Sequence, residues 1–157
     1  CLEQAGLYPF VFLVHGHAFT AFATNELLFE ILDDVTNDLP QVFLRQHNPS
    51  FIDNGKTLLL FDNGDSTTRP TSRVLEFELN EKDKTVTSFK AYNIPAPFAM
   101  SKGNVQLAEA CYFICGGSGN YVLRVNRKTR TVHNEIHYNL TSFRGYWVDD
   151  ITGITKQ

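Results

Sequence analysis

From residue 40 onward, short apolar runs alternate with turn-forming residues, a pattern typical of β-strands joined by tight turns. Asn54-Gly55 separates two such runs, and Asn-Gly is a strong signal for a hairpin turn. Residues 73–79 alternate Val, Leu and Phe with Arg and Glu, which predicts a strand with one face in water. Further strands are predicted at residues 41–46, 57–61, 85–92, 104–107, 111–115, 121–126 and 130–138.

The order of these strands and turns recurs along the chain. Residues 73–79 align with residues 120–126, which places two similar units about 47 residues apart. Four-stranded units repeating at this spacing are typical of a β-propeller. The sequence therefore predicts an all-β fold, a partial β-propeller of about two to three four-stranded blades. Closed propellers use at least about four blades, so we expect more chain or a second subunit to complete the ring.

The first part of the chain has a different pattern, and we separate residues 1–39 as an N-terminal segment from the blades at 40–157. Residues 10–14 predict a buried strand. Residues 18–35 contain no Gly or Pro and have partial helical periodicity. Asn25 can cap a short helix over residues 26–33, so this segment is expected to hold a strand and a short helix.

Charge and hydropathy exclude some classes of protein. The formal net charge is −3 and no basic patch stands out, which argues against a nucleic-acid partner. No stretch reaches the ~20 apolar residues of a membrane helix, so no membrane span is expected. The glycine-rich run at 116–119 lacks the Lys-Ser and the helix that phosphate-binding loops need. We expect neither a cofactor nor a metal.

Three cysteines, Cys1, Cys111 and Cys115, leave at least one thiol unpaired within the chain. On one extended strand, Cys111 and Cys115 would lie roughly 13 Å apart, which is too far for a disulfide between them. We therefore interpret these two as small buried hydrophobic residues.

Several motifs in the middle of the chain occur in a distinctive order. They are Gln46-His47, the Asn54-Gly55 turn, Phe-Asp-Asn-Gly at 61–64, Ser-Arg-Val at 72–74 and Gly-Asn-Val-Gln at 103–106. Their order and spacing over about residues 40–147 resemble the arylsulfotransferase family. The resemblance implies a propeller with a funnel-shaped central site and a secreted or periplasmic location. It also implies transfer of a sulfuryl group from a phenolic sulfate ester to another phenol through a histidine intermediate.

The same resemblance implies catalytic roles for His47, Arg69 and Arg73. His47 matches the family histidine that contacts the sulfate, and the arginines follow the Phe-Asp-Asn-Gly motif. Negative charge spreads over three oxygens during sulfuryl transfer, and an Arg fork can hold two of them. Asn48 and Asn104 are the candidate substrate-binding residues, although the family commonly has another pair where this chain has Asn48 and Pro49.

The histidine that accepts the sulfuryl group stays open at this point. The later blade has no histidine near its glycine-rich turn, so His133 and His137 are candidates by residue type alone. His15 and His17 could supply a site histidine or a metal pair, or could belong to a simple turn. Residues 62–64 are expected to close a turn and take no part in the chemistry.

Two other functions remain open. The chain could be a non-catalytic propeller module that binds a protein or a glycan, or a structural subunit of a larger assembly whose partners cover its strand edges. An enzyme predicts that His47, an arginine and a second histidine converge on one pocket. A binding module predicts aromatic residues on a rim.

Overall fold

The computed structural model describes residues 9–14, 17–22, 29–31, 44–83 and 85–148, and it describes side chains in the last two ranges. In this part of the chain the protein is built of β-strands and two single 3₁₀ turns, at Asp53–Gly55 and Gly117–Gly119. The strands are β1 (Pro9–Val14), β2 (His17–Phe22), β3 (Phe29–Ile31), β4 (Gln46–Ile52), β5 (Thr57–Asp62), β6 (Arg73–Asn80), β7 (Thr85–Asn93), β8 (Asn104–Ala108), β9 (Cys111–Cys115), β10 (Tyr121–Asn126) and β11 (Val132–His137).

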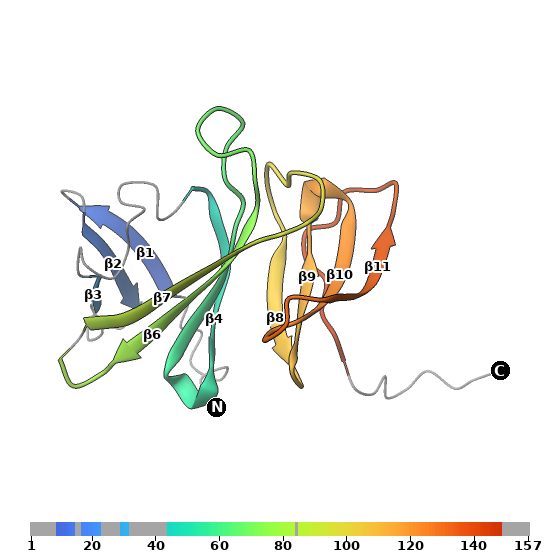
Figure 1. Ribbon diagram of the computed structural model, residues 1–157. Helices are drawn as coiled ribbons and strands as arrows, with labels where there is room; N and C mark the ends of the chain where they lie inside the picture. Colours follow the sequence, from blue (N-terminus) through green and yellow to red (C-terminus); the bar gives the residue numbers. More distant parts are fainter. Residues whose placement is uncertain (1–8, 15–16, 23–28, 32–43, 84, 149–157) are drawn as a thin grey trace.

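The described strands form two sheets (Figure 1). The first has the order β1-β2-β3-β7-β6-β5-β4, in which β3 pairs with β7 in parallel and the other neighbours pair antiparallel. The second has the antiparallel order β11-β10-β9-β8. In both β4–β7 and β8–β11, each strand pairs with the next one along the chain. This repeated four-stranded unit is consistent with a partial β-propeller of about two blades.

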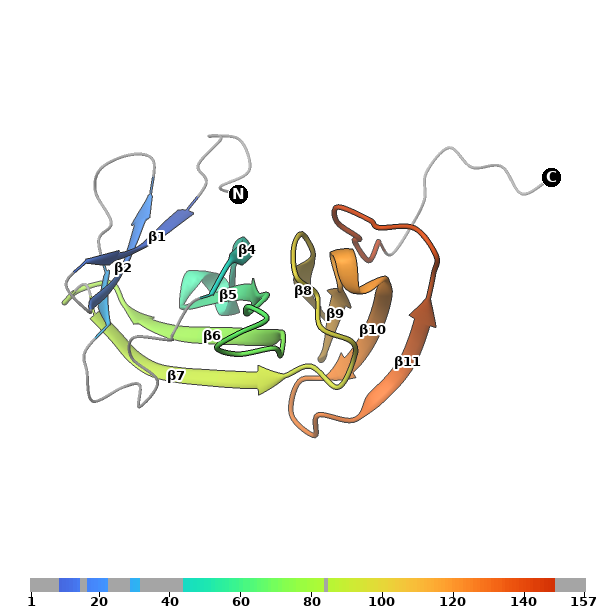
Figure 2. The same cartoon turned by 90° about the horizontal axis from the view of Figure 1, so that it is seen from above.

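Strands β4 and β8, the first of each unit, lie close to one another in the middle of the structure (Figure 2). Between the two sheets lies a continuous apolar core, to which the first sheet contributes Leu59, Phe61 and Val74. Tyr112, Ile114, Tyr121 and Leu123 are among the residues that enter it from the second sheet. Each fully buried aliphatic or aromatic side chain contributes roughly 1.5–3 kcal/mol, so this packing holds the two units together.

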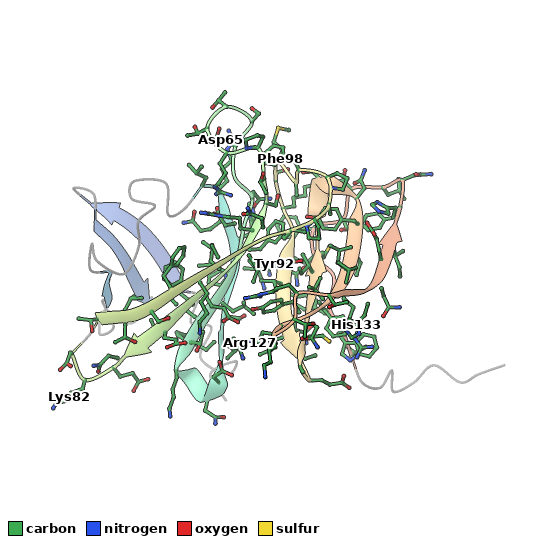
Figure 3. All side chains as sticks on the ribbon, viewed as in Figure 1. Asp65, Lys82, Tyr92, Phe98, Arg127 and His133 are labelled. Atoms are coloured by element: carbon green, nitrogen blue, oxygen red, sulfur yellow. The ribbon has the colours of Figure 1, made fainter. Side chains whose placement is uncertain are left out.

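A polar cluster joins the two sheets beside this core. The carboxylate of Glu76 accepts hydrogen bonds from the Tyr112 hydroxyl at 2.8 Å and from Arg127 Nε at 2.7 Å. Arg127 also forms a forked ion pair with Asp53, and Arg130 lies over the ring of Tyr92. Figure 3 shows Tyr92 and Arg127 between the sheets. Burial and the bond to Glu76 raise the pKa of Tyr112 to about 12.

The structure confirms most predicted strands and corrects three expectations. The helix expected at 26–33 is wrong at Phe29–Ile31, which form β3, because these residues pair with β2 and β7. The strand predicted at 41–46 begins at Gln46 instead, and residues 41–43 lie outside the described residues. The wet face expected on β6 is wrong at Arg73 and Glu76, which are both buried against polar partners, whereas the Glu78 side chain is 46% exposed.

The prediction that Cys111 and Cys115 are buried and do not form a disulfide with each other is confirmed, since both are free and buried. None of the described helices is long and apolar enough to cross a membrane.

The Asp53–Arg127 pair predicts a loss of stability in acid. Arg127 lowers the pKa of Asp53 below its ordinary value of 3.8. A carboxyl whose pKa is lower in the folded state contributes stability above the unfolded value and loses it as the pH falls through the folded value. We expect the gap in Tm between the wild type and Asp53→Asn to narrow from about pH 6 to about pH 3. A gap that stays constant over that range would contradict the assignment.

Candidate functional site

His47 lies at the start of β4, where the strand departs from regular pairing. It pairs with Phe61 of β5, and the register shifts between His47 and Ser50. This irregularity is a β-bulge at Asn48 and Pro49, and Asn48 has a positive φ of 50°. Bulges often lie beside active sites because they redirect a side chain.

The His47 ring is held through one nitrogen. Nδ1 lies 2.6 Å from the side-chain oxygen Oδ1 of Asn63 and 2.9 Å from the backbone carbonyl oxygen of Arg45. A carbonyl oxygen can only accept a hydrogen bond, so Nδ1 carries the proton in the neutral ring. Among the described residues nothing bonds to Nε2, so its lone pair is unoccupied by them.

Asp62, the last residue of β5, is fully buried and ties together three parts of the site. Its Oδ1 accepts the backbone N–H of Leu44 at 2.8 Å. Its Oδ2 accepts Arg69 Nη2 at 2.5 Å and Arg73 Nη2 at 3.1 Å. Burial raises the pKa of Asp62, and the two guanidinium groups act against that rise.

Both predicted arginines therefore meet at Asp62. The Arg73 side chain is buried, whereas that of Arg69 keeps 14% of its surface exposed. Arg69 also donates from Nη1 to the carbonyl of Thr71. The resemblance predicted that these arginines bind sulfate, and the structure shows that both bind a carboxylate of the protein.

Gly64, which follows Asn63, permits this close packing. Its φ is +82°, and a Cβ placed on it would contact the backbone oxygen of Arg69 and lie 2.7 Å from that of Thr71. Gly55 has a similar φ of +87°, but a Cβ there would meet nothing within 4 Å. A substitution at Gly55 therefore tests the cost of backbone strain alone, and one at Gly64 tests strain together with a steric clash.

We expect Gly55→Ala to cost about 1–2 kcal/mol through strain alone. Gly64→Ala should cost about 3 kcal/mol or more, because the clash with backbone atoms adds to the strain. Urea denaturation of both variants measures the difference. Equal losses in the free energy of unfolding would show that the loop around Gly64 moves enough to accommodate a Cβ without a clash.

The two candidate substrate-binding asparagines both contact the segment after β11. Asn48 Oδ1 lies 3.4 Å from the Tyr146 hydroxyl. Asn104 is fully buried, donates to the Gly145 carbonyl at 2.8 Å and accepts the Gly145 N–H at 2.9 Å. Gln106 forms the same pair of bonds with Trp147, so β8 holds residues 145–147 through side-chain amides. The amide of Asn104 is thus already engaged by protein backbone.

The other candidate histidines lie elsewhere. His133 and His137 are exposed on β11, the outer strand of the second sheet (Figure 3 labels His133). Nε2 of His137 pairs with Glu135 at 2.6 Å. His15 lies outside the described residues, and so does the side chain of His17. Among the residues that the structure describes, no three His, Cys, Asp or Glu side chains are placed to hold a metal ion.

Comparison with known proteins identifies the family. The family model described as Arylsulfotransferase (ASST) matches residues 15–144 of the chain. The chain belongs to the arylsulfotransferase family. The match begins well before residue 40, so it also covers part of the segment that the sequence analysis set apart. Comparison with the curated proteins gives no match.

The sequence did not indicate two residues of the site, Asp62 and Asn63. Residues 62–64 were assigned to turn closure, yet Asp62 and Asn63 are both fully buried. Asp62 binds Arg69 and Arg73, and the Asn63 amide contacts His47. The signal was a pair of polar residues directly after the apolar run at 58–61, a place where polar groups need partners from elsewhere in the chain.

Proposed function

We propose that this arylsulfotransferase-family protein transfers a sulfuryl group between phenolic sulfate esters and phenols, and that His47 is the histidine that accepts the group. The family match supports the general reaction. The observation that carries the specific assignment is the His47 ring, which donates from Nδ1 and leaves Nε2 without a described partner.

This arrangement suits a nucleophile. A neutral imidazole attacks through the nitrogen that bears a lone pair, and a proton held on Nδ1 reserves that lone pair for Nε2. When Nε2 gains the sulfuryl group, the ring becomes cationic. Asn63 Oδ1 and the Arg45 carbonyl oxygen then lie where they stabilise that charge. His133 and His137 lie exposed on β11, and the His137 ring bonds through Nε2 to the Glu135 carboxylate.

The arginines supply the charge that the sulfuryl oxygens need. Arg69 and Arg73 bring two guanidinium groups to the end of β5, next to Asn63. Guanidinium groups held in fixed positions stabilise the negative charge that develops on sulfuryl oxygens. Arg69, the more exposed of the two, is the better placed to reach the sulfate.

The reaction takes two steps. Nε2 attacks the sulfur of the donor ester, the N–S bond forms as the bond from sulfur to the aryl oxygen breaks, and the phenolate leaves with the electron pair. The oxygen of a second phenol then attacks the sulfur, and the N–S bond breaks with its electrons returning to Nε2. The proton of the acceptor passes to solvent, and the first phenolate takes one up.

The test is transfer from p-nitrophenyl sulfate to phenol by the full-length protein. We expect p-nitrophenol release that rises with phenol concentration, together with an equal amount of phenyl sulfate. Release that is independent of phenol and yields inorganic sulfate would mean a hydrolase. A folded protein that releases no p-nitrophenol would overturn the proposed function.

A further inference from the structure

We infer that Asn63 is a positioning residue that fixes the tautomer of His47, and that the connection before β8 sets the orientation of Asn63. This inference rests on the proposed function, in which His47 Nε2 is the nucleophile. Asn63 itself would not touch the substrate. Its contribution is to hold the proton on Nδ1 and the ring in one orientation.

The Asn63 amide has one possible orientation. Its Nδ2 lies 2.7 Å from the carbonyl oxygen of Ala99 and 2.9 Å from that of Lys102. Both partners only accept hydrogen bonds, so the NH₂ group must face them, and Oδ1 must face His47. The Asn63 side chain is fully buried, and water cannot replace these bonds at low cost.

The carbonyls that orient Asn63 come from far along the chain, 36 and 39 residues after it. Ser72 strengthens the connection: its hydroxyl donates to the Asn63 carbonyl and accepts the Ala99 N–H, each at 3.0 Å. The segment between the two four-stranded units thereby reaches the histidine of the first unit through a single amide.

Asn63 is the stronger of the two acceptors on Nδ1. Its oxygen lies 2.6 Å away, whereas the Arg45 carbonyl lies at 2.9 Å and belongs to an exposed residue with a positive φ of 61°. Arg45 alone would leave the ring free to turn about its side-chain bonds. The fixed amide of Asn63 removes that freedom, which preorganises the nucleophile.

The first test measures the tautomer directly, without any sulfate ester. The full-length protein carries ¹⁵N in its imidazole rings, a two-bond ¹H–¹⁵N spectrum is recorded at about pH 8, and the signals of His47 are assigned by their loss in His47→Gln. We expect a protonated Nδ1 and a bare Nε2. A proton on Nε2, the form that histidine favours in water, would overturn the inference even if the protein transfers sulfate.

The second test compares Asn63→Ala with Asn63→Asp. Without the amide, Asn63→Ala should give a mixture of tautomers and lower kcat roughly 10- to 100-fold. Asn63→Asp keeps an acceptor for Nδ1–H but removes the NH₂ group that donates to the Ala99 and Lys102 carbonyls. It should therefore retain a protonated Nδ1 where Asn63→Ala does not, and it should unfold at a lower urea concentration than the wild type because two carbonyls lose their donor.

Asn126→Ala is the matched control, because Asn126 accepts backbone N–H bonds in an exposed turn away from the site. It should leave both the tautomer and kcat unchanged. If neither Asn63 variant folds, the wild-type spectrum decides the question. A bare Nε2 in a protein without turnover would uphold the positioning role and overturn the proposed function, so the two failures are distinguishable.

Discussion

Replacement of His47 by Gln is expected to lower kcat/KM for sulfuryl transfer from p-nitrophenyl sulfate by at least about 100-fold. The variant removes Nε2, the ring nitrogen that lacks a partner among the described residues, while its amide can still bond to Asn63. The measurement is steady-state release of p-nitrophenol with phenol as the acceptor. Circular dichroism of the same samples establishes that the variant is folded.

His137→Gln provides the control for this prediction. His137 lies exposed on β11 and pairs with Glu135, so its replacement should change kcat/KM by less than about twofold. A large loss in His137→Gln with a small one in His47→Gln would reverse the assignment and place the nucleophile on the outer strand.

Removal of the Asp62 carboxylate is expected to cost about 3–5 kcal/mol in the free energy of unfolding. In Asp62→Ala the guanidinium groups of Arg69 and Arg73 lose the carboxylate that both bind, and both side chains lie largely out of solvent. The Leu44 N–H also loses its acceptor. Urea denaturation at neutral pH measures the loss, and Asp62→Asn, which keeps an acceptor oxygen, should lose less.

Glu78→Ala is the matched control for a broken ion pair. Glu78 pairs with Lys90, and the two side chains are 46% and 51% exposed. Solvent screens such a pair, so we expect a loss within about 1 kcal/mol. Similar losses in Asp62→Ala and Glu78→Ala would show that the buried carboxylate does not hold the arginines in place.

The strands and turns of the two units could be predicted from sequence because their signals are local. Apolar alternation and the Asn54-Gly55 turn locate β5 and β6 within a few residues, and the repeat indicates a second unit. The strand before them was predicted at 41–46, whereas β4 spans Gln46–Ile52. The same approach fails at β3, where the sequence pattern predicted a helix. The helical periodicity of these residues is overridden by pairing with β7, a strand more than fifty positions away.

The chemistry of the site was predicted less completely, because it depends on contacts between distant residues. His47 was found from its motif, but the sequence does not show that Asn63 bonds to the carbonyls of Ala99 and Lys102. Nor does it show that the carboxylate of Asp62 binds both Arg69 and Arg73. The secreted or periplasmic location stays a prediction.

The central claim is that His47 carries the sulfuryl group, and the most direct test is to isolate that intermediate. The full-length protein is mixed with p-nitrophenyl sulfate without an acceptor, quenched at alkaline pH to preserve the N–S bond, digested and analysed by mass spectrometry. We expect the mass of one added SO₃ group on the peptide that contains His47, and its disappearance when phenol is added before the quench. An SO₃ group on a peptide with another histidine, or turnover without any modified peptide, would contradict the account.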